Sequence, residues 1–548
     1  MKKQFFLRFA RASRAFCVAL LLVSAAPVQA FSPLSGIQAN TYTVNLSTDQ
    51  PDYDLLDPAC DVNPSAEGDQ CTLRAALQQA NSTGGSSTIQ FGVASVSPTS
   101  PLPVVSGGTL GSITIRGNQT VTLDGSLVTP GETSIGLNVT GTFNKVHGLT
   151  VRDFSIGIQL SGNYNTIGVD DSDGSAALEA CTIISNDESD SITGAGIYIT
   201  GNNNVVAGNL VGILWNNTAS GNENGIYVTG NSNRIGTDGD GNLDADERNY
   251  ISSNTESGIR IAGQYGDPIT GNRVSGNTIG LNIAGDTARG NGADGIRFDY
   301  ADNTVIGTNG DGNSDDAEGN LVAANGETGV YIYNSNHAKI AGNRIGVNAA
   351  GNGAIPNIFY GISLYQSDDV TIGTNGDGIS DSLEGNQVSG NSKDGINGSF
   401  FERVRISGNI IGLNASGTSA IPNLYSGIYL DVSLDGLVGT DANGTSDNLE
   451  RNIISGNSYN GIYLSGRGAS DLSNGNTIAG NYIGTNLDGD LPLPNQRDGV
   501  WVGRYAQNNT LGGSLPAQRN IISGNLWEGV HLEGSDQNTI RNNWIGKG

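Results

Sequence analysis

Histidine, methionine, cysteine and aromatic residues are all scarce in this sequence. Its 548 residues include three histidines, one methionine and four cysteines, and aromatic residues make up 6%. His147, His337 and His531 lie in unrelated sequence contexts, which argues against a histidine-based catalytic constellation. After residue 30 no apolar run is long enough to cross a bilayer, and the region beyond residue 104 has no helix-length apolar periodicity. These absences exclude a protein built on membrane-spanning helices.

Residues 1–30 have the three parts of a secretion signal. Five basic residues precede an apolar run from Ala15 to Val23, and Val28-Gln29-Ala30 ends the segment in a small-residue cleavage pattern. The apolar run is too short to span a bilayer. The alternative is an N-terminal anchor that lies at a membrane surface. We expect a mature chain that is secreted or held at a bacterial cell surface, without a transmembrane segment.

Acidic residues outnumber basic residues, 53 Asp and Glu against 27 Lys and Arg, and the formal net charge is −26. Loss of residues 1–30 removes five basic and no acidic residues, so the net charge of the mature chain becomes −31. Such a surface repels nucleic acids and anionic membranes and attracts divalent cations, although solubility alone also explains it. We therefore expect no nucleic-acid partner and no organic cofactor, with calcium as the candidate ion.

One twenty-residue sequence recurs through most of the chain, and each copy starts 66 to 73 residues after the last. Five full copies and one shortened copy begin at Ile167, Ile235, Ile306, Ile372, Val438 and Leu511. The phrases N-x-[IV]-G and G-[IV]-x-[IVLF] recur between them, each a short alternating apolar run bounded by Gly and Asn. Short strands at a constant period predict stacked coils of about three strands, a right-handed parallel β-helix of roughly 13 or 14 coils over residues 104–548. Stacked asparagines can hydrogen-bond along such a rod.

Residues 31–103 differ from the repeats and predict an N-terminal cap. Within DPACDVNPSAEGDQCTLRAALQQANS, Thr72 can cap a helix from Leu73 to Ala80, which would cover the open first coil. Cys60 and Cys71 are close in sequence and the expected compartment is oxidising, so we expect a disulfide between them. Cys181 stands where other copies carry asparagine, which predicts a buried unpaired thiol or, alternatively, a reactive one.

The segment CTLRAALQQAN, with its upstream Cys and Asp-rich stretch, resembles the CSLREA-type N-terminal domain of secreted bacterial β-helix proteins. The phrases RNIISGN, GNYIG and GIYL are similar to the repeats that accompany that domain. The chain departs from the family at Ala75, where Glu is usual, and in its long Asp-rich loops. The resemblance implies the pectate-lyase-like superfamily, which includes lyases, hydrolases, epimerases and adhesins. About function it implies only that the protein acts at a cell surface or on a polysaccharide.

The acidic middle of each repeat copy offers hard oxygen ligands, mostly at alternate positions. Its glycines would allow the backbone to curve closely around a cation. Calcium favours six to eight such oxygens. The copies that begin at Ile235 and Ile306, named here the Ile235 loop and the Ile306 loop, are the best candidates. Their predicted ligands are Asp238, Asp240, Asn242, Asp244, Glu247, Asn309, Asp311, Asn313, Asp315 and Glu318. The pattern is not that of an EF-hand, and a solvated Asx/Gly turn also explains it.

In each G-I-x-I phrase the isoleucines point inward, so the residue between them points outward. These outward positions concentrate aromatic and Arg side chains on one row, with Tyr333 and Tyr365 two residues further on. Rings can stack on sugar faces and Arg can pair with uronate or sulfate groups, although ordinary β-propensity also favours Tyr and Arg here. The predicted ligand-binding residues are Tyr198, Tyr227, Arg260, Arg297, Tyr331, Tyr333, Tyr365, Tyr429, Tyr463 and Trp501.

Three functions fit this sequence. A lyase needs a base and a group that neutralises the uronate, for which the candidates are Arg260, Arg297, Asp299 and Tyr331. No GHG or RIK element of pectin hydrolases and no DPH element of alginate epimerases is present, so a noncatalytic adhesin-like or glycan-binding rod is favoured. A polysaccharide lyase and a purely structural surface protein are the alternatives. The phrase NWIG from Asn543 begins a unit that is left incomplete, which predicts end-to-end association or a fragment.

Overall fold

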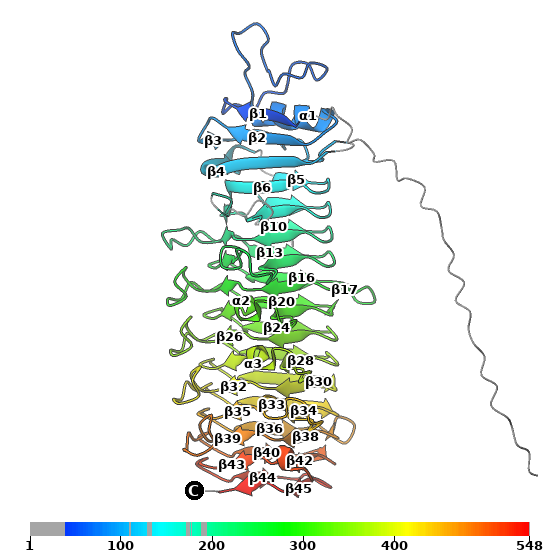
Figure 1. Cartoon of the computed structure of the whole chain (residues 1–548), viewed down its shortest axis with the longest axis vertical. Helices are drawn as coiled ribbons and strands as arrows, with labels where there is room; N and C mark the ends of the chain where they lie inside the picture. The colour runs from blue at the N-terminus through cyan, green and yellow to red at the C-terminus, as the bar shows by residue number, and fades with distance from the viewer. Residues whose placement is uncertain are drawn as a thin grey trace, which may run out of the picture. The chain divides into compact units, whose positions relative to one another are not determined.

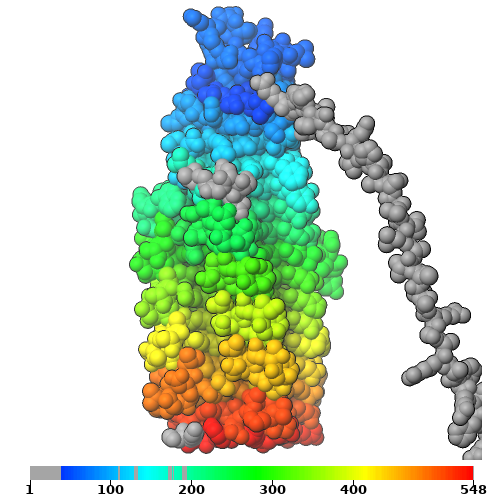
Figure 2. All heavy atoms as spheres, viewed as in Figure 1, coloured from blue at the N-terminus to red at the C-terminus, as the bar shows by residue number. Residues whose placement is uncertain are grey.

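The described part of the chain is a right-handed parallel β-helix, as the repeat predicts. The computed structural model describes residues 39–108, 111–128, 134–170, 176, 178–187 and 194–546, and the predicted signal segment lies outside them. Successive coils add strands to three faces, and each strand pairs in parallel with its equivalent in the next coil (Figure 1). Consecutive coils are stacked in chain order, so the contacts of each coil are with its neighbours (Figure 2).

The strands divide among the three faces as follows. The first face contains β1 (Asn40–Val44), β2 (Ser87–Phe91), β4 (Ile113–Asp124), β6 (Lys145–Arg152), β8 (Thr166–Gly168), β11 (Val205–Ala207), β14 (Arg234–Gly236), β18 (Arg273–Ser275), β22 (Val305–Gly307), β25 (Lys339–Ala341), β28 (Thr371–Gly373), β31 (Arg405–Ser407), β34 (Leu437–Gly439), β38 (Thr477–Ala479), β42 (Thr510–Gly512) and β45 (Thr539–Arg541). The second contains β3 (Ser95–Val96), β9 (Thr182–Ile184), β12 (Leu210–Val211), β15 (Tyr250–Ile251), β19 (Thr278–Ile279), β23 (Leu321–Val322), β26 (Arg344–Ile345), β29 (Gln387–Val388), β32 (Ile410–Ile411), β35 (Ile453–Ile454), β39 (Tyr482–Ile483), β43 (Ile521–Ile522) and β46 (Trp544–Ile545). The long strands β4 and β6 pair with both faces and join them into one sheet.

The third face, named here the third sheet, carries the outward row. Its main path is β5 (Ile135–Val139), β7 (Ile156–Leu160), β10 (Ala195–Ile199), β13 (Asn224–Val228), β16 (Ile259–Ala262), β20 (Ile296–Asp299), β24 (Val330–Tyr333), β27 (Ile362–Tyr365), β30 (Ile396–Glu402), β33 (Ile428–Leu434), β36 (Ile462–Ser465), β40 (Val500–Val502) and β44 (Val530–Leu532). The remaining elements are β17 (Ile269–Thr270), β21 (Ala301–Asp302), β37 (Ser473–Asn474), β41 (Ala506–Gln507), the helices α1 (Leu73–Ser82), α2 (Asp315–Glu318) and α3 (Asp381–Glu384), and the 3₁₀ turns η1 (Gly125–Leu127) and η3 (Pro516–Gln518). No helix among the described residues is long and apolar enough to span a membrane.

Aliphatic side chains stack in register inside the coils. Ile197 pairs with Ile226 and Ile226 with Ile259, and all three are fully buried. Full burial of each such side chain contributes about 1.5–3 kcal/mol. One hydrophobic cluster extends from Tyr42 to Ile522, so the coils share a continuous core.

Asparagine ladders hold the corners between the faces. In each ladder the side-chain carbonyl of one Asn accepts hydrogen bonds from the Asn of the preceding coil, as in the row Asn320, Asn343 and Asn386. The longest ladders contain Asn209, Asn249, Asn277, Asn320, Asn343, Asn386, Asn409, Asn452, Asn481, Asn520 and Asn543, and Asn186, Asn222, Asn254, Asn291, Asn325, Asn357, Asn391, Asn423, Asn457, Asn495 and Asn525. Most of these side chains are buried, so the recurring Asn is architectural, as predicted.

Cys181 takes the place of an asparagine at the start of one ladder. Its backbone N–H donates to Oδ1 of Asn209 at 3.1 Å, as the ladder asparagines do. The thiol is fully buried and makes no disulfide, and burial raises its pKa to about 12. A thiol in this state is inert, so the buried unpaired alternative is confirmed.

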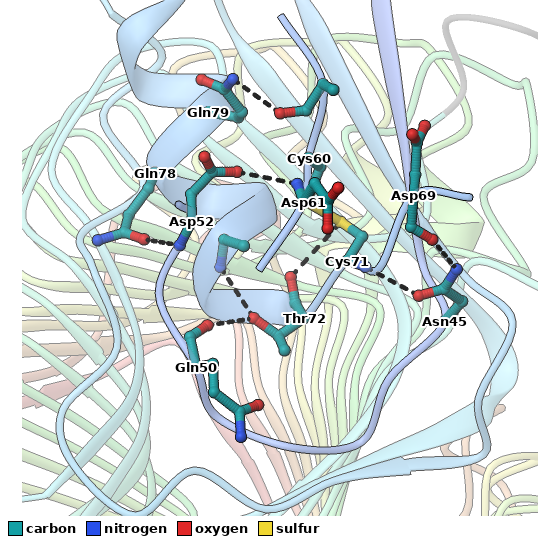
Figure 3. The surroundings of a disulfide bond; sticks show 12 residues. Asn45, Gln50, Asp52, Cys60, Asp61, Asp69, Cys71, Thr72, Gln78 and Gln79 are labelled. Carbon is teal, nitrogen blue, oxygen red and sulfur yellow. Dashed lines mark hydrogen bonds between the residues drawn. A yellow bond between two sulfur atoms is a disulfide. The ribbon is translucent and has the colours of Figure 1, made fainter. Parts of the chain in front are cut away.

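The N-terminal segment folds around the predicted disulfide, which joins Cys60 to Cys71 with a Cα–Cα distance of 5.1 Å (Figure 3). Thr72 caps α1: its hydroxyl oxygen accepts from the N–H of Ala75 at 3.1 Å and its hydroxyl donates to the carbonyl of Gln50 at 2.6 Å. The helix packs against β1 and β2, and its apolar side joins the common core. Ala75 is fully buried there, which gives a packing reason for a small residue at that position.

Candidate functional site

The outward row of the third sheet lies in a single register. Tyr198, Tyr227 and Arg260 occupy paired positions on β10, β13 and β16, and the row continues coil by coil through Arg297 and Tyr331. Further along, Tyr429, Tyr463, Trp501 and His531 occupy the same position on β33, β36, β40 and β44. Because parallel in-register strands place equivalent side chains above one another, the alternation in sequence becomes a physical line.

Side chains of the row stack on one another in two stretches. In the first, the rings of Tyr198 and Tyr227 are stacked with centroids 5.2 Å apart, and the guanidinium of Arg260 lies 5.1 Å from the ring centre of Tyr227. Arg297 lies 4.9 Å from the ring centre of Tyr331. Ser363 and Asn397 then separate this stretch from the second, because they have no ring to continue the stack. Two separate aromatic platforms result.

The second stretch borders a polar cleft of about 400 Å³. The ring centroids of Tyr429 and Tyr463 are 5.1 Å apart, those of Tyr463 and Trp501 are 5.0 Å apart, and those of Trp501 and His531 are 5.1 Å apart. The cleft is lined by Tyr429, Asp431, Tyr463, Ser465, Gly466, Arg467, Arg504, Tyr505 and Glu533. It therefore combines apolar ring faces with hydrogen-bond donors and acceptors of both charges.

Both arginines of this cleft are paired. Arg467 Nε donates to Asp431, and Arg504 lies 3.3 Å from Glu533. Asp431 is buried, and its hydrogen bond raises the pKa of Arg467. The charges of these four groups consequently cancel. The ion pairs also hold the two guanidinium groups in place, where they can donate further hydrogen bonds.

A second aromatic row flanks the first and includes the predicted residues Tyr333 and Tyr365. Their rings are stacked with centroids 5.9 Å apart. Tyr265, Tyr300 and Phe400 extend it, with centroid distances of 6.1 Å for Tyr265–Tyr300, 5.4 Å for Tyr300–Tyr333 and 5.6 Å for Tyr365–Phe400. Tyr300 directly follows β20 and Phe400 lies inside β30, and both have a left-handed backbone conformation that the strand alternation does not reveal.

The four candidate catalytic residues come together. Arg260 pairs with Arg297 across neighbouring strands, and Arg297 Nε lies 2.9 Å from Asp299. Arg297 also lies 3.8 Å from Asp294, a residue that the sequence analysis missed. Asp294 is 2% exposed, and burial raises its pKa to about 7 despite the hydrogen bond from the N–H of Thr328. The same position, two residues before the first inward strand residue, carries Asp394 and Asp498 in later coils, which is the signal that identifies it.

The glutamates of the acidic loops are buried and bound within the protein. Glu247 accepts hydrogen bonds from Arg234 at 2.9 Å and from the N–H of Asp238 at 3.0 Å. Glu318 accepts from Arg273 and, at 2.9 Å, from the N–H of Asn309. Burial raises the pKa of both glutamates, and the charge of the arginine opposes that shift. These contacts give both carboxylates a structural role.

The aspartates at the base of the loops close the turns. Asp244 accepts from Thr237 at 2.8 Å, and Asp315 accepts from Thr308 at 2.6 Å. Burial opposes ionisation of Asp315, but hydrogen bonds from Ser380, Thr308 and two glycine N–H groups hold its pKa below the usual value. Gly239, at φ 74°, lies against the carboxylate of Glu318 from the next loop, where a Cβ would overlap it. Neighbouring loops are therefore stacked on one another.

Three carboxylates of the predicted metal set lie close enough together to face one cation. In the Ile235 loop, carboxylate oxygens of Asp238, Asp240 and Asp244 lie within 4.8 Å of one another. Asn242 donates its N–H to Asp240 at the exposed tip. In the Ile306 loop, Asn309, Asp311 and Asn313 form the equivalent chain of Asx turns. Calcium at these positions stays a prediction, and Asp238, Asp240 and Asp244 are where we would expect it.

No protein-family profile and no curated protein sequence matches the chain, so the CSLREA resemblance stays a prediction. Solved structures give distant similarities. A periplasmic alginate epimerase, AlgG, has 12% identity and a TM-score of 0.36, covering 83% of this chain and 77% of its own. The Dettilon tailspike protein has 17% identity and a TM-score of 0.39 over 91% of this chain and 70% of its own. The A-module of the Azotobacter vinelandii mannuronan C-5 epimerase AlgE6 has 10% identity and a TM-score of 0.28 over 86% and 93%.

Proposed function

We propose that the protein is a secreted or cell-surface rod that binds a linear extracellular polysaccharide, without catalysis, along the outward face of the third sheet. The stacked rings of Tyr429, Tyr463 and Trp501 beside the polar cleft carry this proposal. Aromatic faces suit the apolar faces of sugar rings, and paired arginine and carboxylate heads suit hydroxyl groups. The spacing between coils, about 4.8 Å, is close to the repeat of a sugar ring, so successive sugars can meet equivalent side chains.

The first stretch supports an acidic sugar as one component of the ligand. Arg260 forms no ion pair among the described residues, and its guanidinium is stacked on Tyr227. An arginine fixed on a ring face and without a carboxylate partner is suited to a uronate or sulfate group. Arg297, in contrast, is already paired with Asp299. We expect Arg260 to set any preference for anionic glycans.

Binding to a glycan array, followed by affinity electrophoresis in gels that contain each positive polysaccharide, tests the proposal. In the double variant Tyr429→Ala/Tyr463→Ala the loss of two central rings at about 1 kcal/mol each should weaken binding about thirtyfold. The matched control is Phe143→Ala/Tyr164→Ala, which removes another stacked and exposed ring pair, with centroids 5.3 Å apart, outside the third sheet. An empty array, or equal binding by the two double variants, would refute glycan binding at this face and leave the purely structural alternative.

A polysaccharide lyase is the second candidate, and the cluster around Arg297 favours it. Asp294, with a pKa raised by burial to about 7, could act as a base, and Arg260, which is paired with Arg297 on the neighbouring strand, could neutralise a uronate. Incubation with pectate, alginate and chondroitin, monitored for unsaturated products, tests this alternative. Products that disappear in Asp294→Asn and persist in Asp394→Asn would establish it, whereas no products from any of the three would end it.

A further inference from the structure

Three side chains with metal-ligand atoms meet where the neighbouring strands β40 and β44 begin. Asp498 stands two residues before β40, and Glu528 stands at the equivalent position before β44. The N–H of Gly499 donates to the carbonyl of Glu528 at 2.9 Å, so the two acidic positions are one coil apart. His531 lies on β44 and pairs with Trp501 of β40. A carboxylate oxygen of Asp498, one of Glu528 and a ring nitrogen of His531 all lie within 4.8 Å of one another, and these three residues are named here the Asp498 cluster.

The repeat brings the same positions together in other coils, but with different side chains. Asp294 and Asp394 occupy the position of Asp498, and each accepts a hydrogen bond from the backbone N–H of the residue one coil later, as Asp498 does. In those coils the later residue is Thr328 or Ser426, which has no carboxylate. Among the described residues, the Asp498 cluster is the one such group of three that contains a histidine. Its composition is therefore not a consequence of the repeat.

The carboxylate of Asp498 is buried without a cation. Asp498 is 1% exposed, and its Oδ1 accepts from the N–H of Glu528 at 3.0 Å. It forms no ion pair within the part of the chain that the structure describes. A buried carboxylate beside a second carboxylate is costly, because neither charge is compensated. A cation held between the two acids removes that cost.

We propose that the Asp498 cluster binds one divalent transition-metal ion, with zinc as the expected metal. A histidine nitrogen and carboxylate oxygens are zinc ligands, whereas calcium takes oxygen ligands only. Zinc–ligand bonds of about 2.0–2.2 Å place two tetrahedral ligand atoms about 3.3 Å apart. His531 Nδ1 and Glu528 Oε2 are 3.7 Å apart, so a small movement of these surface side chains closes the site. Three protein ligands leave one position for water or a further ligand.

The metal joins two coils at the end of the aromatic row. Asp498 comes from the coil of β40, and Glu528 and His531 come from the coil of β44, so the bound ion ties one coil to the next. The ring of His531 lies 5.1 Å from that of Trp501, between centroids. Copper binds nitrogen and oxygen sites more tightly than zinc and quenches the fluorescence of a nearby indole. Trp501 is therefore a reporter of occupancy.

Calorimetric titration of the untagged mature chain with zinc chloride tests the proposal, in a buffer that contains calcium to fill sites made only of oxygen. We expect one zinc ion per chain, and a dissociation constant that rises at least about tenfold in His531→Asn and in Glu528→Gln. Both side chains are partly exposed, and circular dichroism checks that the variants fold. The controls are His337→Asn, at an exposed histidine, and Asp394→Asn, three coils before Asp498. Both controls should bind zinc as the wild type does.

Quenching of tryptophan fluorescence by copper is the second measurement, and it should be strong in the wild type and in His337→Asn and weak in His531→Asn. The variant Tyr429→Ala/Tyr463→Ala should keep its zinc affinity, because the metal site does not depend on glycan binding. No heat of zinc binding would overturn the proposal. Equal zinc affinities in His531→Asn and His337→Asn, or copper quenching that survives in His531→Asn, would also overturn it.

Discussion

The asparagine ladders make a quantitative prediction at Asn386. Its Oδ1 accepts from the backbone N–H and from Nδ2 of Asn343, both at 3.0 Å, and its Nδ2 donates to Asn409 at 2.9 Å and to the carbonyl of Ile340 at 2.7 Å. The side chain is 1% exposed, so Asn386→Ala leaves buried groups that water cannot reach. The backbone N–H of Asn343 loses its partner, at a cost of about 1–3 kcal/mol, and three further hydrogen bonds are lost at about 0.5–1.5 kcal/mol each. We expect the free energy of unfolding to fall by about 2.5–7.5 kcal/mol.

Urea denaturation followed by circular dichroism measures this effect, and native-state hydrogen exchange locates it. Coils are coupled only to their neighbours, so exchange should accelerate most in the coils on either side of the substitution. The control is Asn352→Ala on an exposed loop, where the same chemical change should cost less than about 0.5 kcal/mol. A loss below about 1 kcal/mol at Asn386, or equal losses at the two positions, would refute the account of the ladders as buried, fully bonded supports.

Three further predictions concern the cap, the buried acid and the acidic loops. Replacing Cys60 and Cys71 by serine should lower the free energy of unfolding by about 3 kcal/mol, because the disulfide joins two residues with a sequence separation of 11 and so restricts the unfolded chain. Limited proteolysis of this variant should cleave the N-terminal segment first. The pKa of Asp294 is raised in the fold to about 7, so its contribution to stability is complete near pH 4 and is lost as the pH rises through 7. Asp294→Asn should therefore gain stability relative to the wild type between pH 4 and pH 7 in urea denaturation, and a constant difference would contradict the assignment. Calorimetric titration of the mature chain with calcium should show binding that Asp240→Ala weakens. No heat of binding in that titration, together with a melting temperature that a chelator leaves unchanged, would rule calcium out.

Periodicity was sufficient to predict the fold and the register of the outward row. The constant repeat requires stacked coils, and strand alternation in each G-I-x-I phrase determines that Tyr429, Tyr463 and Trp501 point outward on paired strands. Both properties depend only on local pattern and coil length. For the same reason the structural role of the recurring asparagines could be predicted.

Contacts between coils were harder to predict. The cation that binds each loop glutamate was not evident from the sequence: Glu247 binds Arg234 across 13 residues, but Arg273 binds Glu318 and Arg405 binds Glu450, each across 45 residues. The same separation recurs between Lys339 and Glu384, so a constant offset between opposite charges was a signal in the sequence. Asp294 was missed because a turn residue has no alternation that indicates which way it points.

The central claim is that a glycan lies along the third sheet over Tyr429 and Tyr463. Titration of the mature chain with the best polysaccharide from the array, in parallel with Tyr429→Ala/Tyr463→Ala and the Phe143→Ala/Tyr164→Ala control, tests it most directly. The account predicts about thirtyfold weaker binding for the sheet variant and wild-type affinity for the control. Wild-type affinity in both variants, or no polysaccharide that binds the unmodified chain, would contradict it.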